Sequence, residues 1–231
     1  MPPKKRSETP SAPVQDEPRA ASKKQRRDAI IAALRQCMLG KGYAETSLTD
    51  LAGSVQMSVS HLLYYYPTKE AVLLDLARGT HERILVSFGA HRDEPPEERI
   101  HLLVGNMFVA VSREEIGLLR EIIAQSTHSR PLHANLEEFS NKVIAYLEDL
   151  FEKTPRQPGM SAHDAAELAA ALWMGLLINS GFRNPPDNRE ARRLFRRSLL
   201  SLANLDAGGA STAHTSNRSS RPRRKRVSGQ S

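Results

Sequence analysis

The stretch that decides the fold is SLTDLAGSVQMSVSHLLYYYPTK, which runs from Ser47 to Lys69. Ser47 followed three residues later by Asp50 is the pattern of a capping box, which begins a helix by pairing two side chains with free backbone N–H groups. Apolar residues at the spacing of one helical face then predict a short helix after Ser47. These residues are Leu48, Leu51, Ala52 and Val55.

A second short helix is expected after the turn. Ser58 is its expected N-cap, and Leu62 and Leu63 are the two leucines expected to be buried. Pro67 prevents this helix from continuing, because proline lacks the backbone N–H group that a helix interior needs. Two short helices joined by a tight turn form a helix-turn-helix, here at about residues 47–66, and the second helix of such a motif enters the DNA major groove.

The segment from Arg26 to Leu74 resembles the N-terminal part of the TetR family of bacterial transcriptional regulators, over roughly the first third of the chain. The resemblance rests on the order and spacing of an apolar first helix, a Lys-Gly-Tyr step, the helix-turn-helix and the start of the next helix. It implies an all-α fold, with an N-terminal three-helix DNA-binding domain and a C-terminal helical domain for ligand binding and dimerisation. The matching residues are Ile30, Ile31, Ala33, Leu34, Cys37, Met38, Lys41, Gly42, Tyr43, Thr46, Ser47, Leu48, Leu51, Ala52 and the run Ser58 to Ala71.

Two positions depart from the family pattern. Gly-Val is usual in the turn where this chain has Gln56 and Met57, and a residue other than glycine adopts a positive φ there only at some cost. Tyrosine is common where this chain has Leu63. The backbone contact of that tyrosine is therefore expected to be absent, or to be made by Tyr64.

Helix-turn-helix docking predicts which side chains of the second helix contact DNA. Val59 offers an apolar contact to a thymine methyl group, and His61 can form a hydrogen bond with a base edge or bind phosphate. Tyr64 and Tyr65 offer hydroxyl groups to phosphate oxygens. The alternative for His61 is a solvated surface position, and for the two tyrosines it is packing. The expected contacts are Ser58, Val59, Ser60, His61, Tyr64 and Tyr65.

Residues outside that helix are also expected at the DNA. Ser47 can present its hydroxyl group and the helix N-terminus to phosphate. The resemblance implies that Thr49 reads a base, that Lys69 binds phosphate and that Tyr66 is buried. A basic cluster at the start of the first helix is expected to reach phosphates from the groove edge, with a solvated helix start as the alternative. The cluster comprises Lys23, Lys24, Arg26 and Arg27.

Amphipathic segments predict helices through the rest of the chain. The DNA-binding domain is expected at residues 24–84, and the ligand-binding and dimerisation domain at 85–206. The segment 161–182 is apolar on nearly every side, which predicts a partner that covers it. The resemblance places it, together with 187–204, in the four-helix interface of a homodimer. Besides the helix-turn-helix, the expected helices are about 24–40, 68–91, 96–111, 113–127, 131–153, 161–182 and 187–204.

The resemblance also implies that the C-terminal helices enclose a pocket for an unknown small-molecule effector. Trp173 carries an indole N–H group that needs a partner, which favours a partly polar cavity. Plain core packing is the alternative for every lining residue, because helical spacing does not separate a core position from a pocket position. The expected lining is Leu103, Met107, Phe108, Ile122, Phe139, Trp173 and Leu177.

The net charge of +7 is concentrated at the two ends of the chain. Residues 1–22 are expected to be a disordered basic arm, and residues 207–231 a disordered basic tail that includes the run RPRRKR. Residues 1–27 carry +5 and residues 207–231 carry +6, which leaves −4 for the body. This distribution suits contact with phosphates better than with an acidic small substrate. The tail is expected to add either nonspecific DNA affinity or solubility.

Several other classes of protein are disfavoured. The sequence has neither a transmembrane run of about 18 apolar residues nor the apolar stretch of a signal peptide, so a bacterial cytoplasmic, nucleoid-associated protein is expected. One cysteine, Cys37, cannot form an internal disulfide. No histidine pair with metal-binding spacing, nucleophile motif or phosphate-binding glycine loop occurs. We therefore expect no metal site, no cofactor and no enzymatic activity.

These features predict a sequence-specific regulator, a homodimer that binds an inverted repeat in double-stranded DNA and represses transcription until a small molecule releases it. One alternative is an architectural DNA-binding protein without a ligand, which would bind with strong salt dependence and little sequence preference. A second is a helical enzyme with a degenerate helix-turn-helix, which would gather ionisable groups of perturbed pKa in its C-terminal half.

Overall fold

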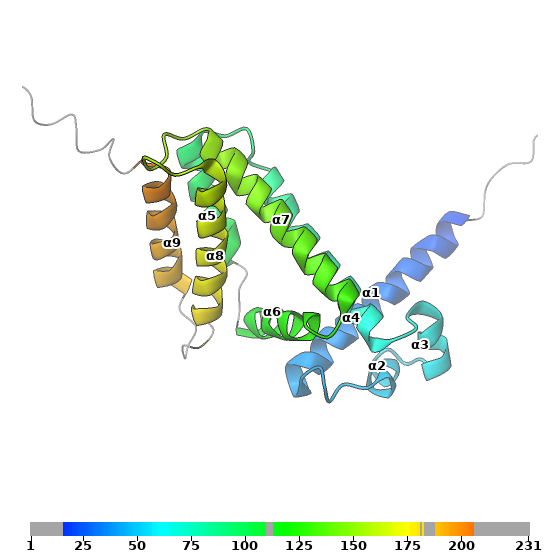
Figure 1. Cartoon of the computed structure of the whole chain (residues 1–231). Helices are drawn as coiled ribbons and strands as arrows, with labels where there is room; N and C mark the ends of the chain where they lie inside the picture. The colour runs from blue at the N-terminus through cyan, green and yellow to red at the C-terminus, as the bar shows by residue number, and fades with distance from the viewer. Residues whose placement is uncertain (1–15, 110–112, 181, 183–187, 206–231) are drawn as a thin grey trace, which may run out of the picture.

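The computed structural model describes residues 16–109, 113–180, 182 and 188–205, and these residues form helices and connecting turns without a strand (Figure 1). The expected all-α fold is confirmed. Along the chain the helices are α1 (Asp16–Lys41), α2 (Leu48–Ser54), α3 (Val59–Tyr65), α4 (Lys69–Gly89), α5 (Pro96–Val109), α6 (Arg113–Ser126), α7 (Arg130–Glu152), α8 (Ala162–Ser180) and α9 (Asn188–Leu202).

A small N-terminal domain is built from α1, α2, α3 and the start of α4. Each of these helices is too short or too polar to be stable alone, so each depends on burying one apolar face. Ile30 and Leu34 of α1 meet Leu51 of α2, Leu62 of α3 and Leu73 of α4 in one core, and all five side chains are fully buried. This core fixes α3 relative to the rest of the chain.

The larger body contains the rest of α4 and helices α5 to α9. Its helices α7 and α8 pack closely along each other, and α9 lies against both α5 and α8 (Figure 1). Aromatic residues from four helices meet in its core, where Phe88 contacts Trp173 edge to face and Phe108 contacts Phe195 in the same manner. Such aromatic pairs favour this geometry because the ring edge is positive and the ring face negative.

Helix α6 lies between the two domains, beside α1 and below α7 in Figure 1. Its residues Leu118 and Ile122 are buried in the core of the N-terminal domain, although they belong in sequence to the second half of the chain. The Ser129 hydroxyl, at the N-cap of α7, donates a hydrogen bond to Glu70 at the start of α4. The domains are therefore joined by packing as well as by the continuous helix α4.

The first helix begins earlier than the sequence analysis expected. Helix α1 starts at Asp16 instead of near residue 24, so the boundary of the N-terminal arm at residue 22 is too late. Pro18 lies in the first turn, where its missing N–H group is not needed, and strong helix formers such as Ala20 and Ala21 follow it. Residues 1–15 of the predicted arm and the predicted tail at 207–231 lie outside the described residues.

Candidate functional site

Helix α3 presents one face outward and is anchored by the other. Leu62 is fully buried in the domain core, while Ser60, His61 and Tyr64 are exposed, Tyr64 to 72%. The Ser58 hydroxyl accepts a hydrogen bond from the backbone N–H of His61 at 3.2 Å, which confirms its expected role as N-cap. Three of the six side chains predicted to contact DNA are therefore exposed on this helix, and the N-cap Ser58 is exposed as well.

The remaining members of the predicted set are partly covered. Val59 and Tyr65 are half-buried and pack against the core of the N-terminal domain. The Tyr65 ring contacts His61, with centroids 5.4 Å apart, and Tyr64, with centroids 5.2 Å apart. Lys23 of α1 lies over the Tyr64 ring, 5.8 Å from its centroid. The three aromatic side chains thus form one surface that continues onto the basic start of α1.

The expectation that Leu63 is buried is wrong. Its side chain is 41% exposed, because Leu62 already points into the core and the next helical position is turned by about 100°. Leu63 therefore joins the outward face, beside Ser60. Sequence reasoning missed it by treating two adjacent leucines as one buried pair, although neighbouring positions of a helix point about 100° apart and need not face the same core.

The turn before α3 is a Schellman motif in which Gln56 takes the place usually held by glycine. Its φ is +54°, in the left-handed region. Met57 donates its N–H to the Ala52 carbonyl at 2.9 Å, and Gln56 donates to the Gly53 carbonyl at 3.2 Å. The departure from the family pattern therefore leaves the turn geometry intact, at the cost of a strained residue.

Replacing Gln56 with glycine is expected to stabilise the protein by up to about 1 kcal/mol. Glycine removes the left-handed strain of about 1–2 kcal/mol, and its greater freedom in the unfolded chain offsets part of that gain. Urea denaturation of Gln56→Gly and wild type measures the difference. Gly53→Ala, at a helical position in the same turn, is the control for a general effect of glycine content. A clear loss of stability in Gln56→Gly would contradict the strain argument.

Lys69 is engaged inside the domain. Its ammonium donates to the carbonyl oxygens of Tyr43 at 2.7 Å and Thr46 at 2.6 Å, and it lies 4.1 Å from the centroid of the Tyr43 ring. Burial lowers the pKa of Lys69 below its ordinary value. Two of its three hydrogens hold the loop that precedes α2, which leaves one for the predicted contact with phosphate.

The start of α2 has the predicted capping box. The Ser47 hydroxyl accepts from the Asp50 N–H at 3.1 Å, and Asp50 accepts from the Ser47 N–H at 2.7 Å. Lys41 pairs with Asp50 at 2.8 Å, and this contact, followed by the Ser47 hydroxyl, holds the pKa of Asp50 well below its ordinary value. Thr49 is exposed and remains available for the contact predicted for it, whereas the exposed Ser47 hydroxyl already donates to the Asp50 carboxylate at 2.6 Å.

A polar network that the sequence did not reveal locks the end of α3 to α1 and α4. Asp75 of α4 accepts hydrogen bonds from the Arg27 guanidinium and from the Tyr66 hydroxyl, the latter at 2.9 Å. The Tyr66 ring is buried as expected, and Arg27 lies over it, 4.4 Å from its centroid. Burial and the Asp75 carboxylate raise the pKa of the Tyr66 hydroxyl. Arg27 is thus a brace for the domain as well as a member of the predicted basic cluster.

The residues predicted to line an effector pocket are all buried, but they separate into two groups. Leu103, Met107 and Phe108 lie in the general core of the body. An enclosed cavity of about 50 Å³, bounded by α4, α6, α7 and α8, is lined by the other four: Ile122, Phe139, Trp173 and Leu177. Helical spacing could not make this distinction, because it depends on how four helices meet.

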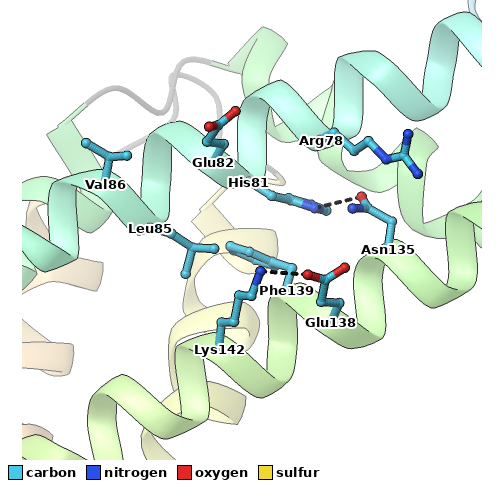
Figure 2. Close-up of a pocket in the computed structure, with 9 residues that line it drawn as sticks. All are labelled: Arg78, His81, Glu82, Leu85, Val86, Asn135, Glu138, Phe139 and Lys142. Carbon is cyan, nitrogen blue, oxygen red and sulfur yellow. Dashed lines mark hydrogen bonds and ion pairs between the residues drawn. The ribbon is translucent and has the colours of Figure 1, made fainter.

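A wider groove lies on the other side of His81 and Phe139, between α4 and α7 (Figure 2). Its volume is about 540 Å³, and no residue of it except Phe139 was predicted. The His81 ring stacks on Phe139, with centroids 4.1 Å apart and planes 10° apart, and its Nδ1 lies 3.0 Å from the Asn135 side-chain oxygen. These two rings line both the groove and the enclosed cavity.

Among the residues that the structure describes, no three His, Cys, Asp or Glu side chains come together in a way that could hold a metal ion. Within the same residues, no helix is long and apolar enough to cross a membrane.

The DNA-binding part of the chain matches a known protein family, and its overall fold resembles solved structures. The family model described as "Bacterial regulatory proteins, tetR family" matches residues 30–76, which include α2, α3 and parts of α1 and α4. No curated protein sequence matches the chain significantly. Solved structures show that the fold is that of TetR regulators, with an N-terminal helix-turn-helix and a C-terminal helical domain.

Three of those solved structures show how far the likeness extends. A TetR transcription regulator from Haloarcula marismortui superposes with a TM-score of 0.68 at 17% identity and covers 79% of this chain and 98% of its own. A transcriptional regulator from Rhodococcus sp. Rha1 superposes with a TM-score of 0.68 at 14% identity and covers 78% of this chain and 96% of its own. GusR from Salmonella enterica superposes with a TM-score of 0.59 at 22% identity and covers 77% of this chain and 95% of its own.

Proposed function

We propose that this chain, whose residues 30–76 carry the DNA-binding domain of the TetR family of bacterial regulatory proteins, is a homodimeric repressor that a small-molecule effector releases from an inverted-repeat operator. The observation that carries the proposal is the exposed face of α3, formed by Ser60, His61, Leu63 and Tyr64 on a helix whose other face is fixed in a packed core. The protein would act on chromosomal DNA in the bacterial cytoplasm.

Side chains on this face divide by chemistry into two roles. Ser60 and His61 carry hydrogen-bonding groups that suit base edges, and Leu63 offers an apolar contact to a thymine methyl group. Tyr64 can donate its hydroxyl to a phosphate, and Lys23 beside it adds a positive charge at the groove edge. One such helix reads only a few base pairs, so a dimer that reads two half-sites about one helical turn apart gains specificity.

The outward face of α8 supports dimerisation. Ala165, Ala169, Trp173 and Leu177 are buried within the chain, whereas Leu168 on another face of α8 is 52% exposed. Leu194 of α9 is exposed as well. A second copy of the chain, related by a two-fold axis, would cover both leucines in the four-helix interface expected from α8 and α9.

Replacing Leu168 with glutamate is expected to weaken the dimer by about 100-fold or more. Each copy loses the burial of a leucine, worth about 1.5–3 kcal/mol, and the symmetry axis brings two like charges together. Sedimentation analysis over a range of protein concentrations measures the change. Val86→Glu is the matched control, because Val86 is 68% exposed on α4, away from the expected interface. An unchanged dimer in Leu168→Glu would place the interface elsewhere.

Helix α6 provides the physical connection between effector and DNA. Leu118 and Ile122 line the enclosed cavity and at the same time pack in the core of the N-terminal domain. A ligand that enlarges the cavity would therefore push α6 against that core and change the spacing of the two α3 helices. A preference of about 3 kcal/mol for the DNA-free form lowers the DNA affinity by roughly 100-fold.

In vitro selection of bound DNA from a random duplex pool, at a stated salt concentration, tests the proposal. An enriched inverted repeat is the expected result, and it would supply the operator for all later measurements. Salt-sensitive binding without enrichment would favour the architectural alternative, in which basic segments coat DNA without reading it. The absence of any DNA binding would contradict both the regulator proposal and the architectural alternative.

A further inference from the structure

The enclosed cavity in the body has an unusual chemical lining. Among the described residues that line it, none carries a formal charge, and most are leucine, isoleucine or methionine. The polar exceptions are Thr80 and His81 of α4 and Trp173 of α8. The Thr80 hydroxyl is already used, because it donates to the Leu76 carbonyl at 2.9 Å. His81 and Trp173 therefore decide what the cavity can bind.

Both of these side chains carry a buried nitrogen without a partner. His81 and Trp173 are each only 4% exposed, and neither His81 Nε2 nor Trp173 Nε1 has a hydrogen-bond partner in the described structure. Leaving a buried polar atom unpaired is costly, so such atoms mark the position of a water molecule or a ligand group. Both residues belong to the wall of one cavity, and together they favour a single occupant with polar character.

The hydrogen bond to Asn135 assigns the role of each nitrogen. His81 Nδ1 faces the Asn135 side-chain oxygen, which can only accept, so Nδ1 carries the hydrogen. Burial lowers the pKa of His81 and keeps the ring neutral, and its Nε2 is then an acceptor. The indole Nε1–H of Trp173 is a donor only. The residues of the cavity wall thus include one acceptor and one donor among mostly apolar side chains.

We propose that this cavity binds the hydroxyl group of an uncharged, mainly apolar effector. The hydroxyl hydrogen is donated to His81 Nε2, and the hydroxyl oxygen accepts from Trp173 Nε1. A carboxylate would meet the lone pair of Nε2 without a cation beside it, and an ammonium group would find no anion. A hydrocarbon would leave both nitrogens unpaired. This inference rests on the proposed effector-controlled function and names the chemical class of the effector.

The neighbouring groove supplies the space that the cavity lacks. The cavity alone holds only one or two water molecules, whereas the groove of about 540 Å³ lies in the size range of ligand pockets. Its rim carries two positive and two negative side chains, with Lys142 and Glu138 paired at 2.6 Å, so it does not select a charged ligand (Figure 2). The effector would enter from the groove past His81 and Phe139.

The first test compares four small probes of nearly equal size that differ in their polar group. They are n-hexanol, its isomer pentyl methyl ether, hexanoate and hexylammonium. Trp173 is the only tryptophan in the chain, so its fluorescence reports binding in the cavity directly. The expected result is that n-hexanol binds about tenfold more tightly than the ether, which cannot donate to His81, and than either charged probe.

Two substitutions then assign the preference to the proposed atoms. His81→Phe keeps a ring that stacks on Phe139 but removes the acceptor, and Trp173→Phe removes the donor. By titration calorimetry, each is expected to weaken n-hexanol binding about tenfold, and His81→Phe to abolish the preference over the ether. Lys142→Gln, on the groove rim, is the control and should leave the preference unchanged.

Tighter binding of hexanoate or hexylammonium by the unmodified protein would overturn the inference. So would the absence of any fluorescence change up to the solubility of n-hexanol, because water alone would then fill the cavity. These measurements need no DNA, and the operator selection needs no ligand. A failure of the ligand class is therefore distinguishable from a failure of the proposed DNA-binding function.

Discussion

Replacing Asp149 with alanine is expected to lower the free energy of unfolding by about 3 kcal/mol, because it strands a buried positive charge. Arg99 is completely buried, and its guanidinium donates to Asp149 at 2.9 Å. The other two guanidinium nitrogens have no hydrogen-bond partner in the described structure. The centroid of the Tyr146 ring lies 5.0 Å away and adds a cation–π contact, but the ring carries no negative charge.

Urea denaturation measures this loss, and two variants control for other causes. Lys153→Ala removes a neighbour that also pairs with Asp149 but is half exposed, so its effect is expected to be below about 1 kcal/mol. Arg99→Met combined with Asp149→Ala removes both charges and is expected to recover most of the stability, since an apolar pair avoids the desolvation cost. A loss below about 1 kcal/mol in Asp149→Ala would contradict the role given to this pair.

The same pair predicts how stability depends on pH. Burial alone would raise the pKa of Asp149, but hydrogen bonds from Lys153 and Arg99 outweigh it, and the pKa lies below its ordinary value of 3.8. A carboxylate with a lowered pKa stabilises the fold fully above its unfolded-state pKa. The contribution is therefore complete above about pH 4 and is lost as the pH falls through the folded-state value. Asp149→Ala should remove this part of the acid dependence.

Replacing His61 with alanine is expected to change which base the protein prefers and to weaken binding to the selected operator at least about thirtyfold. A side chain that reads a base edge contributes roughly 1–3 kcal/mol of discrimination, and a dimer makes the contact twice. His61 is exposed, and only its backbone N–H, which donates to the N-cap Ser58 hydroxyl, takes part in the helix cap. The fold should therefore be unaffected, with a change in stability within about 0.5 kcal/mol.

Repeating the DNA selection with His61→Ala measures this effect directly. The matched control is Tyr64→Phe, one turn of α3 away, which keeps the exposed ring and removes only the hydroxyl proposed for phosphate. It should weaken binding to all sequences alike and leave the selected operator unchanged. An unaltered base preference in His61→Ala would show that this face of α3 does not read DNA as proposed.

The sequence determined those features that depend on neighbouring residues. The capping box of Ser47 and Asp50, the N-cap at Ser58 and the end of α3 before Pro67 all appear where the residues predict them. Helix starts and turns are local, because backbone N–H groups at a helix end need partners within about three residues. Apolar spacing likewise identified the later helices, and each of their ends lies within two residues of its expected position.

Tertiary structure decided everything that depends on how helices meet. Leu63 is exposed because the way α3 packs turns Leu62, and not Leu63, toward the N-terminal core, and Asp75 joins Arg27 and Tyr66 only because α4 passes beside α1. Trp173 and His81 are almost a hundred positions apart, yet they line one cavity. Contacts of this kind leave no periodic trace in the sequence, since any buried helix face looks alike until its neighbours are placed.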